Sequence, residues 1–209
     1  SDGQPVSGVL VVAYDKRLSY QTDSTNSSGA FSISGLKKGE HRIRFLPPSS
    51  HNGIEFYFPL EPELCEAVPQ WVKRADTLVL GEVVMPDGGV IQGTLGDTRG
   101  IGAGVRVTAV PRMEGTAPID RNDRTDDRGK FEIRGVPTQW SGEEYILKIE
   151  PDEGVAEQYL GPAYDEEGAA VLTVTEGEVA TLGFEPVLAG GSVQGTIRGG
   201  GRGLEGASV

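Results

Sequence analysis

The chain has one cysteine, two histidines and no long apolar run, and each shortage excludes a class of protein. With Cys65 alone, no disulfide can form within the chain, so its stability must come from packing and backbone hydrogen bonds. No apolar run reaches the roughly 18 residues that suggest a membrane-spanning helix, so the sequence predicts no membrane span. The 209 residues suffice for two domains of ordinary small size.

Positive charge is also scarce. The chain has 19 lysines and arginines against 31 aspartates and glutamates, a net charge of −12. Without a basic stripe, nucleic-acid binding is not expected. Residues 87–189 hold 20 acidic and 9 basic side chains and so carry most of the charge. We interpret this acidity as a solvated surface, with a face for Ca²⁺ or a cationic partner as the alternative.

Glycine is abundant and the apolar residues alternate, which favours strands over helices. The chain has 31 glycines and 13 prolines, and no long amphipathic helix is visible. Phe31 and Ile33 alternate with Ser32, as Phe131 and Ile133 alternate with Glu132, and period-two alternation is typical of a strand with one buried face.

An internal recurrence of about 100 residues organises the chain. Residues 25–36 (TNSSGAFSISGL) align with residues 125–136 (TDDRGKFEIRGV), and Gly-Gly-x-x-Gln-Gly-Thr begins at both Gly88 and Gly190. Each copy offers about seven or eight short strands with turns every 8–12 residues. We therefore predict an all-β fold of tandem antiparallel sandwiches, prealbumin-like or Ig-like, with Greek-key connections. The expected domains are residues 1–86, residues 87–189, and a further segment, 190–209.

The frame of the recurrence predicts one missing strand. In the second copy, residues 90–95 (VIQGTL) form a first strand, whereas the first copy has no equivalent ahead of Gly8. Residues 192–197 form a first strand with no domain behind it. The chain is expected to be either a fragment of a longer array or a subunit whose C-terminal strand completes the first sandwich of the next molecule. The expected assembly strand is Ser192, Val193, Gln194, Gly195, Thr196 and Ile197.

Several motifs resemble the carboxypeptidase regulatory-like domain, which is related to transthyretin-like and collagen-binding B-type sandwiches. They are Gly-x-Pro-Val-x-Gly-Val at Gly3–Val9, the Thr-Asp-x-x-Gly-x-Phe-like turns, and the Gly-Leu/Val strand that follows each turn. The resemblance covers nearly the whole chain. The chain is similar to tandem copies of this domain in large bacterial surface proteins. It implies a prealbumin-like sandwich used as a stalk, spacer or adhesive module.

Relatives of this domain have two chemical features, a zinc site and an isopeptide crosslink, for which this chain does not have the matching residues. Some relatives accompany zinc carboxypeptidases, but His51 and Glu55 have the wrong spacing for that family's His-x-x-Glu ligands. Some collagen-binding B-type domains carry an isopeptide crosslink from a lysine on the first strand. Because residues 90–95 and 192–197 contain no lysine, no such crosslink is expected.

Two groups of side chains are candidate sites. The aspartates Asp120, Asp123, Asp126 and Asp127 crowd one segment and could bind Ca²⁺ through carboxylates, although interleaved arginines favour a polar hairpin turn. The aromatic residues Trp140, Tyr159 and Tyr164 could stack on a sugar ring or anchor a protein partner. No nucleophile motif or phosphate-binding loop is visible, so no cofactor and no enzymatic activity are expected.

The sequence therefore favours a non-catalytic structural or adhesive module at a bacterial cell surface, reached after export. The expected partners are other copies of the chain, head to tail, or neighbouring repeats of a longer chain. The alternative is a carbohydrate- or protein-binding accessory module of a secreted enzyme, which would bind a surface glycan or protein.

Overall fold

The protein is all-β, as the alternation predicts. The computed structural model describes residues 3–96, 103–112, 121–138, 144–150, 155–161, 163–191, 193–195, 198–199 and 202–203. Every regular element in these ranges is a strand. The described residues contain no helix with the length and apolarity that crossing a membrane would require.

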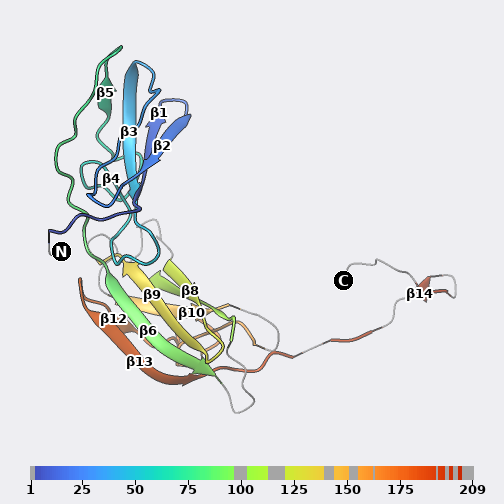
Figure 1. Ribbon diagram of the computed structural model, residues 1–209. Coiled ribbons are helices and arrows are strands. Elements are labelled where there is room, and N and C mark those ends of the chain that lie inside the picture. Colours follow the sequence, from blue (N-terminus) through green and yellow to red (C-terminus); the bar gives the residue numbers. More distant parts are fainter. Residues whose placement is uncertain are drawn as a thin grey trace.

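The first five strands form one antiparallel sheet (Figure 1). They are β1 (Leu10–Asp15), β2 (Tyr20–Ser24), β3 (Gly39–Leu46), β4 (Phe56–Tyr57) and β5 (Gln70–Val72). β1 lies between β2 and β3, and the short β4 and β5 both pair with β3. The alternating side chains of β1 and β3 face one core, with Val11 directly opposite Phe45.

The next eight strands form two sheets that pack face to face. One sheet contains β6 (Gly89–Gly96), β9 (Lys130–Val136) and β13 (Val179–Pro186). The other contains β7 (Arg106–Pro111), β8 (Arg121–Arg124), β10 (Glu144–Ile149), β11 (Gln158–Tyr159) and β12 (Leu172–Thr173). A separate hairpin joins β14 (Arg198–Gly199) and β15 (Arg202–Gly203).

Alternation builds the core between these two sheets. On β9, Phe131 and Ile133 are buried and Glu132 is exposed, and on β10, Leu147 and Ile149 are buried. Burial of each large apolar side chain contributes about 1.5–3 kcal/mol. This cluster shares no residue with the core beneath β1 and β3. Two separate cores support our proposal that the chain divides near residue 87.

One strand pair departs from the antiparallel pattern. β13 runs parallel to β6, from the pair Val179–Val90 to the pair Pro186–Gly96. A parallel pair needs a long crossover. Here the chain passes through β7–β12 before it returns beside β6, so the connection is long enough.

The first copy lacks the corresponding three-stranded sheet. Residues 30–36 align with β9 and residues 77–84 align with β13, yet neither segment forms a strand. The prediction of a strand at Phe31–Ile33 was therefore wrong. In the second copy, β6 lies between β9 and β13 and hydrogen-bonds to both. No described segment takes that central position in the first copy, so its two flanks have no ladder partner.

Candidate functional site

The aspartates predicted as metal ligands hold a turn together. Asp126 Oδ1 accepts hydrogen bonds from the amides of Arg128 (2.9 Å) and Lys130 (2.8 Å). The Lys130 amide, followed by that of Arg128, lowers the pKa of this carboxyl. Asp123 Oδ2 accepts a bond from the Glu132 amide at 2.8 Å, and Asp127 is exposed.

Asp120 lies outside the described residues. Within the ranges that the structure describes, no group of three or more His, Cys, Asp or Glu side chains is placed to hold a metal ion. A Ca²⁺ site at these aspartates stays a prediction.

The aromatic candidates differ in how far they are buried. Tyr159 on β11 is buried, and its hydroxyl lies 3.3 Å from Glu166 Oε1. Burial, followed by the charge of Glu166, raises the pKa of this phenol. Tyr164 is 74% exposed. Trp140 lies outside the described residues, so the ligand-binding role of the three stays a prediction.

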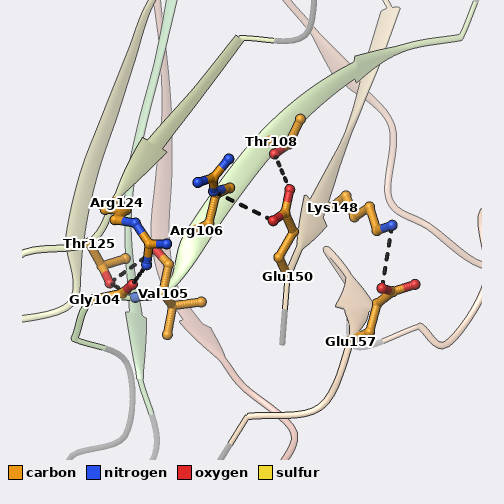
Figure 2. A network of polar contacts seen from close by, with 9 residues as sticks. All are labelled: Gly104, Val105, Arg106, Thr108, Arg124, Thr125, Lys148, Glu150 and Glu157. Carbon is orange, nitrogen blue, oxygen red and sulfur yellow. Dashed lines mark hydrogen bonds and ion pairs between the residues drawn. The ribbon is translucent and has the colours of Figure 1, made fainter. Parts of the chain in front are cut away.

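A polar network covers β7, β8 and β10 (Figure 2). Glu150 accepts a hydrogen bond from the Thr108 hydroxyl at 3.1 Å and pairs with Arg106 at 3.5 Å. Nearby, Lys148 pairs with Glu157 at 3.4 Å. These ion pairs join neighbouring strands across a half-exposed surface, where such pairs contribute little to stability.

One hydroxyl in Figure 2 has a counterpart in the first copy. Thr125 Oγ1 accepts a hydrogen bond from the Val105 amide at 2.9 Å, and Thr25 Oγ1 accepts one from the Val9 amide at the same distance. Both threonines are buried. The recurrence thus extends to the hydrogen bond at the residue just before β1 and at the residue just before β7.

A small cavity of about 550 Å³ lies beside β3 and β4. Arg44 pairs with Glu55 on its wall and lies 5.7 Å from the ring centre of Tyr57. The Cys65 thiol donates a hydrogen bond to Glu63 at 3.2 Å, and this bond raises the pKa of the thiol. A protonated thiol is a poor nucleophile, so this cavity offers no activated cysteine.

A larger groove of about 850 Å³ opens into the core of the first sandwich. Its walls include Phe31, Phe45, Phe56 and Val83, and residues 3–6 also border it. Phe31 and Ile33 are only partly buried, whereas Phe131 and Ile133 on β9 are 3% and 1% exposed. The groove thus lies beside Phe31, whose ring is less buried than that of its counterpart Phe131.

A tight joint connects the loop after β3 with the start of β6. The backbone oxygen of Asn52 accepts a hydrogen bond from the Gly88 amide at 2.7 Å, and the Ile54 amide donates to Pro86 at 2.9 Å. The Asn52 side chain donates to the Gly88 carbonyl and accepts from the Gly135 amide on β9 at 2.9 Å. One asparagine therefore connects the loop after β3 to the segment before β6 and to β9.

Close backbone approach packs this joint. Gly135 has φ +64°, and a Cβ atom there would lie 2.5 Å from the carbonyl oxygen of Gly53. Arg121 on β8 lies beside it, with Nε and one terminal nitrogen buried and without a hydrogen-bond partner among the described residues. Burial lowers the pKa of this guanidinium. Nothing in the local sequence around Asn52 marks it as a joint residue.

The described part of the predicted assembly strand, residues 193–195, lies away from the sheets (Figure 1). Val193 is fully exposed, and Gln194 and Gly195 are exposed as well. Ser192, Thr196 and Ile197 lie outside the described residues. The chain leaves the second sandwich after β13, at the end opposite to the joint (Figure 1).

No protein-family model and no curated protein matches the chain. Among solved structures, it is similar to the minor pilin GBS52 of Streptococcus agalactiae, with 17% identity over 93% of this chain and 89% of that one, at a TM-score of 0.33. A mutant of the shaft pilin SpaA of Lactobacillus rhamnosus GG has 11% identity over 92% and 96%, at 0.36. The TIE protein of Bacillus anthracis has 14% identity over 90% and 32%, at 0.32. With values this low, the similarity implies nothing about what the chain does.

Proposed function

We propose that the chain is a non-catalytic structural module of a stalk, spacer or fibre outside a bacterial cell. Its two sandwiches act as rigid beads, and the joint sets the angle between them. The finer parts of this proposal are membership of the carboxypeptidase regulatory-like domains and head-to-tail linkage by strand addition. The partners are then other copies of the chain or neighbouring repeats.

The joint carries the proposal. A flexible linker would leave the beads free to rotate, whereas here the Asn52 side chain and backbone together make three hydrogen bonds across it. Each such bond contributes about 0.5–1.5 kcal/mol, and a buried donor that loses its partner costs more. A spacer needs such fixed geometry, because its length depends on the angle between its beads.

The polar groups of the described residues support a structural role. The carboxylates of Asp123 and Asp126 accept backbone hydrogen bonds, and the Cys65 thiol donates a hydrogen bond to Glu63. These groups are used to hold turns and strands. They do not converge on a common point where a substrate could react.

Small-angle X-ray scattering of the intact chain tests the proposal. We expect the wild type to scatter as one fixed shape, and Asn52→Ala to scatter as a flexible pair of beads with a wider spread of dimensions. The matched control is Asn122→Ala, at an exposed asparagine on β8. A flexible wild type, or an Asn52→Ala variant as rigid as the control, would remove the basis of the spacer proposal.

One observation favours the second candidate, a carbohydrate- or protein-binding accessory module. The Tyr164 ring is 74% exposed, which suits stacking on a sugar or a partner side chain. In this case Tyr164→Ala would lose binding to a glycan panel while unfolding at the wild-type temperature. Unchanged binding by this variant, or no binding by the wild type, would count against the second candidate.

A further inference from the structure

The outer face of the first sheet carries four aromatic rings. On β3, the side chains at positions 41, 43 and 45 are buried, so the alternating residues at positions 40, 42 and 44 face the other way. Residues directly opposite each other on paired strands share a face. The strand register therefore places four aromatic residues on the outer face: Tyr14 on β1, Tyr20 on β2, Tyr57 on β4 and Trp71 on β5.

These rings are open to solvent to different degrees. The Tyr20 side chain is 62% exposed and that of Trp71 is 53% exposed, whereas Tyr14 and Tyr57 are partly buried. The Tyr14 and Tyr20 rings lie 5.9 Å apart, centre to centre. Exposed aromatic side chains gathered on one face are typical of an interaction site.

The fold itself does not require these rings. The second sandwich repeats the same sheet, with β7 in the place of β1 and β12 in the place of β5. Its register puts Val110 where the first sheet has Tyr14, and Thr173 where it has Trp71. The corresponding surface of the second sandwich carries the polar network of Figure 2. The aromatic rings of the first sheet therefore serve its surface and not its folding.

The charges on this face are paired with each other. Arg44 Nε donates a hydrogen bond to the Glu55 carboxylate at 2.8 Å, and Lys16 pairs with Glu40 at 3.1 Å. The complement of such a charge-balanced surface is an uncharged molecule that carries both donors and acceptors. A protein partner covering the face would have to strip water from these ions, which is costly. Hydroxyl groups of a ligand would instead replace the hydrogen bonds that water makes.

The cavity of about 550 Å³ beside β3 and β4 opens on the same face. Its walls include Arg42, Glu55, Tyr57 and Glu63. Arg42 Nε donates to the Ala67 carbonyl at 3.3 Å, and a guanidinium has four further N–H groups to offer. The cavity thus combines cationic donors and carboxylate acceptors with an aromatic ring. A sugar ring matches this combination, because it has an apolar C–H face and a rim of hydroxyl groups.

The spacing of the rings indicates a ligand longer than one sugar. Tyr20 on β2 and Trp71 on β5 are separated by three steps across the sheet, from β2 to β1, β3 and β5. At about 4.8 Å per step, this separation is about 14 Å. A single sugar ring cannot contact both side chains, whereas an oligosaccharide lying across the strands can.

We propose that the outer face of the first sheet binds an uncharged oligosaccharide. Its sugar rings stack on Tyr20 and Trp71, and its hydroxyl groups form hydrogen bonds with Arg42 and Glu55 in the cavity. This inference goes beyond the spacer function and does not depend on it. The site also differs from the one at Tyr164, which lies on the second sandwich.

Calorimetric titration of the intact chain tests the proposal. The probes are the neutral hexasaccharides cellohexaose, maltohexaose and hexaacetylchitohexaose, with hexagalacturonate as the anionic comparison. We expect binding of a neutral probe, and roughly tenfold weaker binding by Tyr20→Thr and by Trp71→Thr. Trp71→Thr installs the residue that β12 carries at this position, so the sheet should still form. Phe184→Thr, at a 64% exposed aromatic residue on β13, is the control and should bind as the wild type does.

Tryptophan fluorescence locates the ligand on the sheet. The chain has two tryptophans, so in a Trp140→Phe background the emission comes from Trp71 alone. We expect the bound hexasaccharide to shift this emission, and an unshifted emission on binding would place the ligand elsewhere and overturn the proposal.

Four results of the titrations would also overturn it. They are no binding of any neutral probe up to millimolar concentration, equal affinities of Trp71→Thr and Phe184→Thr, tighter binding of hexagalacturonate than of the neutral probes, and self-association of the wild type that Trp71→Thr abolishes. The last result would identify the face as a protein interface. The scattering test of the Asn52 joint is unaffected by any of these outcomes.

Discussion

Replacing Gly135 and Gly35 by alanine, one at a time, isolates the contact between the two sandwiches. The two glycines align in the recurrence, and both have positive φ, +64° and +74°. A Cβ atom at Gly35 would meet no atom within 4 Å, whereas one at Gly135 would lie 2.5 Å from the Gly53 oxygen. Both variants therefore share the backbone strain, and only Gly135→Ala adds a collision across the joint.

The two costs can be estimated separately. An alanine in the left-handed backbone region costs about 1–2 kcal/mol of folding free energy, and both variants carry this cost. The Gly53 carbonyl in Gly135→Ala must move by several tenths of an ångström, and overpacking of this kind costs about 1–3 kcal/mol more. The joint should therefore open roughly 5- to 150-fold more often in Gly135→Ala than in Gly35→Ala.

Native-state hydrogen exchange measures this opening. The Gly88 amide donates across the joint to Asn52, so its exchange rate reports whether the joint is closed. We expect faster exchange of this amide in Gly135→Ala and wild-type exchange in Gly35→Ala. Equal exchange rates in the two variants would refute the claim that backbone contact holds the sandwiches together.

Two further predictions concern the repeated positions within the sandwiches. Phe131→Ala should lower the free energy of unfolding of the second sandwich by about 3–5 kcal/mol. Phe31→Ala should lower that of the first sandwich clearly less, because Phe31 is only partly buried. Denaturant unfolding of each variant measures both values, and equal losses would contradict the prediction. Backbone hydrogen bonds, first that from Lys130, lower the pKa of Asp126 below its ordinary 3.8, so the stability from this carboxylate is present above that value and is lost as the pH falls through the lowered pKa. Asp126→Asn keeps an acceptor oxygen that does not titrate, so its unfolding temperature should fall less on acidification than that of the wild type; parallel pH profiles would contradict this.

The second sandwich could be predicted well from its sequence. Alternation at Phe131 and Ile133 predicts β9, which forms with both side chains buried. The same alternation at Phe31 and Ile33 predicts a strand that does not form. Local pattern decides which face a segment can bury, but a strand also needs a hydrogen-bonding neighbour, and no described strand pairs with residues 31–33.

The candidate sites also differ in how far the sequence predicts them. The frame of the recurrence predicts a domain boundary near residue 87, and this boundary stays a prediction. The joint could not be inferred, because Asn52 gains its role from Gly88 and Gly135, which lie 36 and 83 residues further along the chain. The sequence predicts a polar turn at Asp126, but which amides donate hydrogen bonds to its carboxylate depends on the folded backbone.

The parallel pairing of β6 and β13 determines how the second sandwich responds to tension. The chain enters this sandwich at Gly89, the start of β6, and its last strand ends at Pro186, the end of β13. Because the two strands run the same way, these points lie at opposite ends of the pair. A force applied along the chain therefore slides one strand past the other and strains all the hydrogen bonds between them together, instead of peeling them apart one by one.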